Sequence, residues 1–401
     1  MKNLYNTLLR IFAISSKFIL ALYITKVFGL DIMGMYGITI SIISFIVYLS
    51  GAELYAVLTP KYSNHHKKNS FYFSNQIFFS FISCLLLTLV TIIFIEKNNF
   101  IYLIFFVAVV ESISQEIYRL LLIRGNSLAA NILFFIKNGT WPYLALICYY
   151  TFDIKNPIEL LLAIWFFCDL IGIFVYINFL KKKNSITVSI RKVNLKFLTC
   201  CIPKLIPVFS GSIIMRCIVT LDKLILSYFT TLSNVGIYSF FFSICNALQA
   251  LIDAGYISSS YKKIITLSVN KKFRDFRKII LNLMIISILL MFPTTILSYV
   301  FFVIFKFNDY KDNIFLLVLI LISTFFLSAN NVTKLFLISS KKLKLILVSS
   351  LIAFLSFSTL CLLLFFNIGS PITVMSINIT TSSMSYFFIS MFFIKRLSKN
   401  G

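Results

Sequence analysis

The sequence predicts an all-α polytopic membrane protein with about 12 transmembrane helices. Its 401 residues are 59% hydrophobic and only 12% charged, which is outside the range of soluble globular domains. The apolar stretches are continuous, and each is long enough to cross a bilayer as a helix of about 20 residues. Membrane barrels instead have strands that alternate between apolar and polar residues. Finally, lysine and arginine gather in alternate gaps between the stretches.

The apolar stretches define twelve predicted spans. In chain order they cover residues 8–28, 35–57, 73–95, 101–123, 132–152, 159–180, 205–228, 235–258, 278–305, 314–333, 345–366 and 372–394.

The distribution of positive charge predicts the orientation. With the N-terminus in the cytoplasm, 27 of the 37 lysines and arginines fall on the cytoplasmic side and four on the opposite side. The other six lie inside spans, while Arg10 and Lys278, near the cytoplasmic ends of their spans, are counted with the cytoplasmic side. The positive-inside rule therefore places both termini in the cytoplasm. Most of the net charge of +24 is then topological and can contact anionic membrane lipids, so it does not indicate nucleic-acid binding.

A long basic connection at residues 181–204 divides the predicted spans into two groups of six. We therefore expect an N-terminal six-helix lobe at residues 1–190 and a C-terminal six-helix lobe at residues 191–401.

Short sequence similarities relate the two halves. Gly34 and Tyr36, where the second span begins, match Gly236 and Tyr238, where the eighth span begins, at an offset of 202 residues. This predicts parallel repeats related by an axis along the membrane normal. Each glycine is expected at the start of the second helix of its lobe, where a turn needs a small residue.

Motifs of known catalytic or cofactor sites are absent from the sequence. Walker A, HExxH and GxSxG patterns do not occur, and the outer connections are too short for a catalytic domain. The eight cysteines lack the spacing of a metal site. We therefore expect no enzymatic activity, no cofactor and no metal, which leaves movement of a substrate across the membrane.

Basic residues inside the spans are the main candidates for substrate binding, because each costs roughly 2.5 to 3.5 kcal/mol to insert at the bilayer centre. Arg216 and Lys223 are seven residues apart, so an unbroken helix places them on one face about 10 Å apart. Asp222 points elsewhere on such a helix and would not neutralise both. We predict that Arg216 and Lys223 line a water-filled cavity and bind an anionic substrate.

Lys137 and Lys17 complete the set of predicted substrate-binding cations. Lys137 lies five residues before Pro142, which removes a helical hydrogen bond and is expected to kink the fifth span. A cation beside such a kink, in a helix that also bears Trp141, is typical of a cavity wall rather than of a lipid-facing surface. Lys17 lies within the first span.

Acidic residues in the spans are candidates for ion coupling or for pairing across helices. Those without an evident cation nearby in sequence are Glu53, Glu111, Asp169 and Asp253. By contrast, Glu116 and Arg119 are three residues apart on one predicted helix and are expected to neutralise each other.

Four segments resemble a known family. They read VFGLDIMGMYGITISI (27–42), GAELYAVLTPKYS (51–63), LLLIRGN (120–126) and LDKLILSYFTTLSNVGIYSF (221–240). Together they resemble the Wzx-type polysaccharide-unit flippases of the multidrug/oligosaccharidyl-lipid/polysaccharide (MOP) exporter superfamily. The resemblance covers nearly the whole chain, although the motifs are short.

The resemblance implies two six-helix lobes in a V shape around a central cavity. It implies export of an undecaprenyl-pyrophosphate-linked oligosaccharide, an O-antigen or related repeat unit, from the cytoplasmic to the periplasmic leaflet of a bacterial inner membrane. Expected partners are this lipid-linked substrate, membrane lipids, a polysaccharide polymerase and a chain-length regulator. The family carries cations in its lumen, which matches Arg216 and Lys223, followed by Lys17 and Lys137.

Two other function classes compete with this interpretation. An O-antigen polymerase or ligase is also polytopic, but it resembles proteins with a large periplasmic loop, and every outer loop here is short. An ion-coupled drug antiporter of the same superfamily would favour acids over cations in its pocket. The charges inside these spans are mixed.

Overall fold

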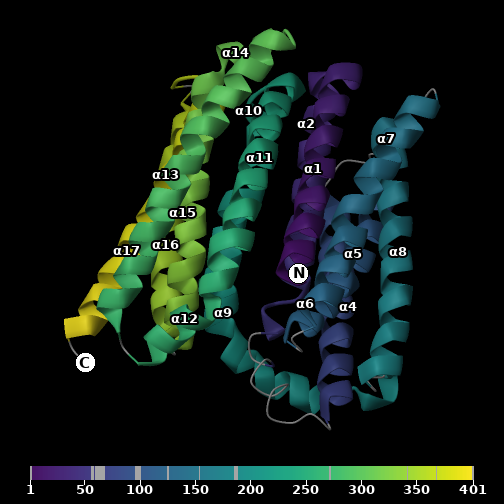
Figure 1. Cartoon of the computed structure of the whole chain (residues 1–401), viewed down its shortest axis with the longest axis vertical. Coiled ribbons are helices and arrows are strands. Elements are labelled where there is room, and N and C mark those ends of the chain that lie inside the picture. Colours follow the sequence, from purple (N-terminus) through teal and green to yellow (C-terminus); the bar gives the residue numbers. More distant parts are fainter. Residues whose placement is uncertain are drawn as a thin grey trace. The chain divides into compact units, whose positions relative to one another are not determined.

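The structure is a computed structural model, and it describes residues 2–55, 58, 68–94, 101–123, 126–152, 154–184, 188–270, 272–340, 342–366 and 368–399. Every regular element in these ranges is a helix (Figure 1). The chain divides into two compact units. One comprises Met1–Tyr23 with Thr39–Phe209, and the other comprises Ile24–Ile38 with Ser210–Gly401.

The helices up to residue 192 are α1 (Lys2–Phe28), α2 (Leu30–Ser50), α4 (Asn69–Phe94), α5 (Ile101–Ile123), α6 (Ser127–Phe135), the π-helix η2 (Ile136–Thr140), α7 (Trp141–Thr151), α8 (Pro157–Asn184) and the 3₁₀-helix η3 (Ile190–Lys192).

The remaining helices are α9 (Leu195–Thr220), α10 (Asp222–Phe229), α11 (Leu232–Ile252), the π-helix η4 (Asp253–Ile257), α12 (Ser258–Val269), α13 (Phe273–Ile304), α14 (Asn308–Asp312), α15 (Ile314–Ser339), α16 (Leu343–Phe365) and α17 (Pro371–Lys399).

The predicted all-α polytopic fold is confirmed. Among the described residues, ten unbroken helices are long and apolar enough to cross a membrane, and one bent pair raises the number to eleven. The fifth predicted span is absent from these because η2 interrupts it between α6 and α7. The seventh is divided between α9 and α10, and α9 itself bends by 52° near Pro203, where a proline removes a helical hydrogen bond.

The connection between α1 and α2 is shorter than predicted. The expected outer loop of about six residues is reduced to Gly29, which has φ +88°. Glycine adopts this left-handed conformation without the steric cost of a side chain, so helix continues on both sides of one residue. Residues 30–34, expected in the loop, therefore form the first turn of α2.

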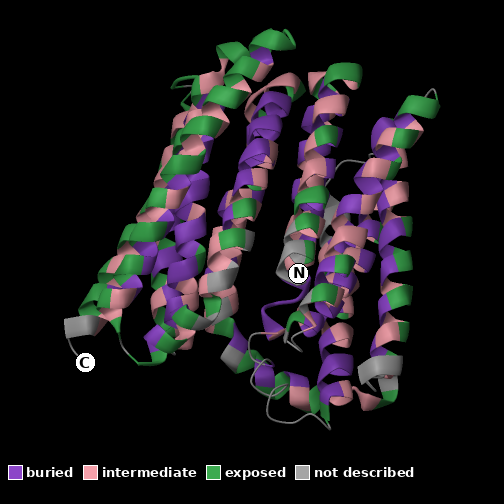
Figure 2. Cartoon of the chain, in the orientation of Figure 1, coloured by how far each residue is buried: buried purple, intermediate pink, exposed green. Residues whose placement is uncertain are grey.

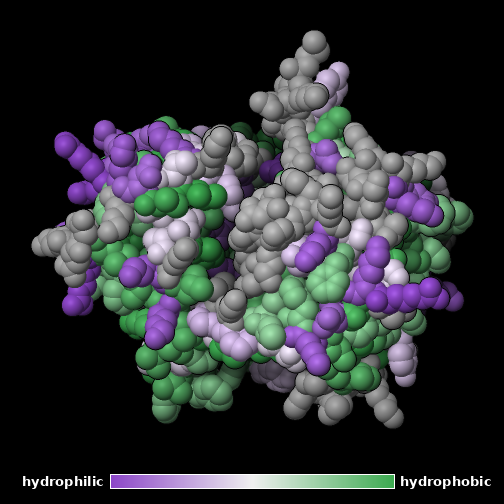
Figure 3. Space-filling model, turned by 90° about the horizontal axis from the view of Figure 1, so that it is seen from below, coloured by the Kyte–Doolittle hydropathy of each residue, from purple (hydrophilic) through white to green (hydrophobic). Residues whose placement is uncertain are grey.

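Within the first unit, α5 packs against α4 and α8 (Figure 1). The apolar core around α5 includes Phe73 of α4, Ile117 of α5 and Leu133 of α6, all fully buried. Figure 3 looks at the end of the unit where η3 leads into α9, and hydrophilic side chains are spread over this face. That segment belongs to the basic connection between the two predicted groups of spans, and its Arg191 and Lys196 are exposed.

Within the second unit, α15 is the central helix, and it packs against α11, α12, α13 and α17. In the most apolar part of α15, 61% of the residues are buried, against 22% in α13 (Figure 2). Many of the exposed side chains of α13 are nevertheless apolar and large, among them Leu289, Phe292 and Leu297. An apolar, exposed helix face of this extent is suited to contact with lipid chains.

The helices α2 and α11 repeat each other in length and position. Both contain 21 residues, and both of their ends are separated by the predicted offset of 202. Gly34 and Gly236 are each the fifth residue of their helix, which confirms their predicted place at the start of the second long helix of each half. Neither glycine has a positive φ, so a turn is not the reason for glycine at these positions.

Candidate functional site

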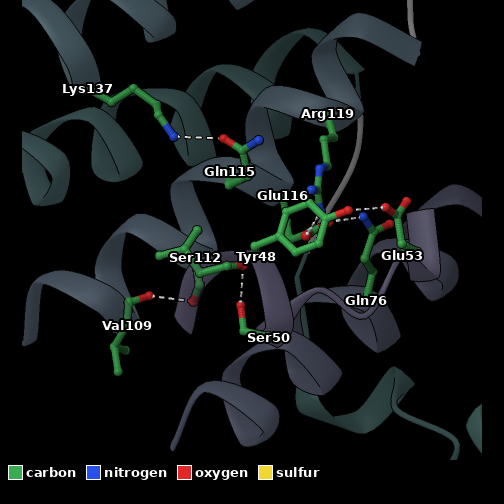
Figure 4. A network of polar contacts seen from close by, with 11 residues as sticks. Tyr48, Ser50, Glu53, Gln76, Val109, Ser112, Gln115, Glu116, Arg119 and Lys137 are labelled. Carbon is green, nitrogen blue, oxygen red and sulfur yellow. Dashed lines mark hydrogen bonds and ion pairs between the residues drawn. The ribbon is translucent and has the colours of Figure 1, made fainter. Parts of the chain in front are cut away.

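Lys137 is paired across helices inside the first unit. It lies in η2, is only 2% exposed, and places its Nζ 2.5 Å from Glu111 Oε1 of α5. The same Nζ donates to Gln115 Oε1 at 2.9 Å, a contact visible in Figure 4. Of the two roles expected for Glu111, ion coupling and pairing across helices, the structure shows the pairing. A buried charge needs such a partner because its desolvation costs several kcal/mol.

Asp169 adds a second carboxyl group to this cluster. It lies in α8, is 0% exposed, and interacts electrostatically with the carboxyl group of Glu111. Neither oxygen receives a hydrogen bond from a donor group elsewhere in the described residues. The cluster therefore contains two adjacent carboxyl groups of which one also contacts a lysine.

Lys17 approaches the same region from α1 with neutral partners. Its Nζ donates to Asn138 Oδ1 at 2.7 Å and lies 5.6 Å from the centre of the Trp141 ring. Trp141 in turn stacks on Trp165 with their ring centres 4.7 Å apart. Within the described residues, no carboxylate oxygen lies within the 4.0 Å of an ion pair from the Lys17 ammonium group.

The helix irregularity at η2 brings these partners together. The prediction placed a kink at Pro142, and the structure has a π-helix immediately before it, in which Thr140 Oγ1 bonds to the Ile136 carbonyl oxygen. Such π-bulges occur often at functional sites. Because Gly139 has no side chain, α1 packs closely there: an added Cβ would lie only 3.0 Å from Ala13 Cα.

A second charged cluster joins α2, α4 and α5 in the first unit (Figure 4). Glu116 and Arg119 form an ion pair at 2.6 Å, which confirms their predicted mutual neutralisation. Gln76 Nε2 donates to the other Glu116 oxygen. Glu53 follows α2 in a left-handed conformation, with φ +57°, and accepts a hydrogen bond of 2.8 Å from the Tyr48 hydroxyl. Such a conformation is rare for a non-glycine residue and is found at sites that the surrounding structure holds fixed.

The unbroken helix assumed for Arg216 and Lys223 is interrupted in the structure. Because α9 ends at Thr220 and α10 begins at Asp222, the spacing of seven residues does not by itself place the two cations on one face. Lys223 Nζ lies 3.5 Å from Asp222 Oδ1 and 4.2 Å from the centre of the Phe242 ring. Arg216 remains within α9 and is half-buried. Their roles as substrate-binding cations remain predictions.

Asp222 pairs with one of these two cations, Lys223, whereas the sequence predicted only that it would not neutralise both. Its side chain is 0% exposed, and its Oδ2 accepts a hydrogen bond of 2.8 Å from the Tyr238 hydroxyl of α11. The sequence also gave no role to Gln115 or Asn138, which hold Lys137 and Lys17. Gln115 follows Glu111 by four residues, which places both on one helix face and was the signal available for it. The remaining predicted acid, Asp253, is the half-buried first residue of η4.

The sequence matches no protein-family model and no curated protein sequence. Solved structures with the same fold do exist. The Vibrio cholerae MATE transporter VcmN superimposes with a TM-score of 0.67 and 13% identity, over 100% of this chain and 97% of that one. The eukaryotic MATE transporter AtDTX14 gives 0.63 and 12%, over 100% and 97%.

The protein has the MATE/MOP transporter fold. The MOP superfamily transporter from Pyrococcus furiosus, whose binding pocket is described as reversed in polarity, has a TM-score of 0.62 and 10% identity over 99% of this chain and 96% of that one. Inward-facing and outward-facing structures of a MATE family transporter match with TM-scores of 0.57 and 0.63. These similar structures are of transporters rather than enzymes, and the described residues contain no cluster of three metal-ligating side chains.

Proposed function

We propose that the protein is a flippase that moves an undecaprenyl-pyrophosphate-linked oligosaccharide from the cytoplasmic to the periplasmic leaflet by alternating access. The transporter fold supports movement of a substrate, and one observation supports an anionic one. Lys17 is bound by the neutral groups of Asn138 and Trp141, so its positive charge is not cancelled by direct contact with a carboxylate of the described residues. A cation of this kind in a membrane helix is suited to binding phosphate.

Arg216, Lys223 and Lys137 belong to this proposal as the further substrate-binding cations, and Lys137 is also paired with Glu111. The adjacent carboxyl groups of Glu111 and Asp169 are the proposed ion-coupling pair, because neither Asp169 oxygen has a hydrogen-bond partner among the described residues. The proposed location is a bacterial inner membrane with both termini in the cytoplasm, alongside a polymerase and a chain-length regulator.

The same pair of carboxyl groups favours the second candidate function, export of cationic drugs. The similarity to drug-resistance transporters concerns the fold, and acids in a pocket suit a cationic substrate. Lys137 and Lys17 oppose this function, because two ammonium groups beside the acids repel a cation.

The deciding experiment places the purified protein in liposomes and compares two substrates. We expect lipid-linked oligosaccharide to move between leaflets, measured by its accessibility to an added glycosidase, and ethidium to remain where it was loaded. Movement of ethidium without movement of the lipid-linked oligosaccharide would instead establish the drug antiporter. A reporter fused after Gly401 tests the orientation: activity confined to the periplasm would contradict the cytoplasmic C-terminus.

A further inference from the structure

Arg10 lies seven residues before Lys17 in α1, and like Lys17 it donates to an asparagine side chain. Arg10 Nε donates to Asn131 Oδ1 at 2.8 Å, and its Nη2 lies 3.5 Å from the Tyr118 hydroxyl. Lys17 Nζ donates to Asn138 Oδ1 at 2.7 Å. The two cations are seven residues apart, and so are the two asparagines that bind them.

This spacing places the two cations on one face of α1. Seven residues make almost two turns of an α-helix and correspond to about 10 Å along its axis. Between the two cations, Ala13 of α1 packs closely against Gly139. This keeps α1 close enough to α6 and η2 for both asparagines to reach the cations. Sequence reasoning treated Arg10 only as a topological charge at the cytoplasmic side.

The partners at both steps are uncharged. Asparagine oxygens, a phenol hydroxyl and aromatic rings orient the cations without neutralising them. Neither Arg10 nor Lys17 has an ion pair within the part of the chain that the structure describes. An aspartate at either asparagine position would compete with an incoming anion, and an amide does not. The contacts of Arg10 use Nε and Nη2, so Nη1 is available to an anion.

We propose that Arg10 and Lys17 form a two-step cation ladder along α1 that binds the phosphate groups of the lipid-linked substrate in succession. This inference rests on the proposed function and specifies its anion-binding residues. Two cations about 10 Å apart along the axis act as successive positions for one phosphate group. Arg10 receives the substrate near the predicted cytoplasmic end of the first span, and Lys17 takes it further into the unit.

The asparagines allow a test that changes charge while preserving shape. Asn131→Asp and Asn138→Asp keep an oxygen for the cation and add a carboxylate that neutralises it. Asn194→Asp is the matched control, because Asn194 is exposed and caps the start of α9 through the Phe197 N–H, where an aspartate is equally suitable.

Binding is measured by tryptophan fluorescence of the purified full-length protein in nanodiscs of neutral phosphatidylcholine. The chain has two tryptophans, Trp141 and Trp165, which stack on each other beside Lys17, so the signal reports on this step of the ladder. The probe is undecaprenyl pyrophosphate. Inorganic pyrophosphate and nanodiscs that contain phosphatidylglycerol are the comparison arms, which separate the substrate lipid from a free anion and from an ordinary lipid headgroup.

We expect the wild type and Asn194→Asp to bind undecaprenyl pyrophosphate with similar affinity, and each ladder variant to bind at least tenfold more weakly. The thermal stability of the ladder variants should not fall, because each new carboxylate meets an existing cation. Arg10→Gln and Lys17→Gln keep an amide donor for the same asparagines, and we expect them to bind undecaprenyl pyrophosphate as weakly as the aspartate variants. If an aspartate variant does not accumulate, these glutamine variants test the proposal in its place.

Two outcomes separate the inference from the proposed function. If the wild type binds undecaprenyl pyrophosphate and all four ladder variants bind it equally well, the ladder is refuted and the flippase proposal stands. If the wild type does not bind it, the proposed function fails and the inference with it. A response to phosphatidylglycerol as strong as that to undecaprenyl pyrophosphate would assign the ladder to ordinary lipid headgroups and overturn its role in transport.

Discussion

Gly34 of α2 and Gly236 of α11 lie against each other within the second unit, and each occupies the same place in the other's surroundings. A Cβ added to Gly34 would overlap the Leu232 carbonyl oxygen, and one added to Gly236 would overlap the Leu30 carbonyl oxygen. Each added Cβ would also lie 3.3 Å from the backbone nitrogen of the other glycine. The reason for glycine here is therefore a close helix crossing rather than a turn.

This reciprocal contact predicts that Gly34→Ala and Gly236→Ala are both destabilising. The atoms that a methyl group meets are backbone atoms, which cannot rotate away, so the helices must separate. Overpacking of this kind costs typically about 1–3 kcal/mol. The measurement is thermal unfolding of the detergent-solubilised protein. Gly255→Ala is the control, because a Cβ there meets nothing within 4 Å. Equal melting temperatures for all three variants would show that the crossing tolerates separation.

Lys17 is predicted to act through its charge. Lys17→Arg should retain most surface polysaccharide when it complements a flippase-deficient strain, whereas Lys17→Gln should reduce it at least tenfold at equal protein level on an immunoblot. The control is Lys278→Gln, since Lys278 has a 69% exposed side chain and a loose pair at 3.7 Å with Asp275. Normal polysaccharide from Lys17→Gln would remove Lys17 from the substrate path.

The Glu111–Lys137 pair makes a stability prediction in the form of a double-mutant cycle. Lys137→Met leaves a buried carboxylate without its cation, and breaking a buried pair in this way typically costs about 3–5 kcal/mol. Glu111→Gln combined with Lys137→Met removes both charges and should recover more than half of the lost melting temperature. Additive effects of the two substitutions would mean that the contact contributes no coupling energy.

Because Asp222 pairs with Lys223, the structure changes the effect expected of Lys223→Ala relative to Arg216→Ala. The sequence alone predicts that Arg216→Ala and Lys223→Ala leave the protein inserted and reduce only transport. Because Lys223 lies 3.5 Å from the fully buried Asp222, its removal should also lower the amount of folded protein. Lys223→Ala combined with Asp222→Asn should restore that amount, as measured by size-exclusion chromatography of the solubilised protein. Unchanged levels for Lys223→Ala alone would show that Tyr238 suffices to hold Asp222.

Several features of the protein follow from short segments of sequence. Hydropathy over about 20 residues predicts the spans because the bilayer acts on each helix separately. The equivalence of Gly34 and Gly236 was also visible, since a repeated sequence produces repeated helices. The Glu116–Arg119 pair was predictable because its spacing lies within one helix.

Tertiary structure alone decided the partners of the buried charges. Lys137 with Glu111, Lys17 with Asn138 and Arg10 with Asn131 are each contacts between different helices. Arg216 and Lys223 lie in two separate helices, α9 and α10, where the sequence predicted one span. The physical reason is the sequence distance over which each effect acts. Hydropathy and helical periodicity act along a single helix. A buried charge is instead stabilised by the group that packing brings within about 3 Å of it, and the sequence separation of that group is not encoded by any periodicity.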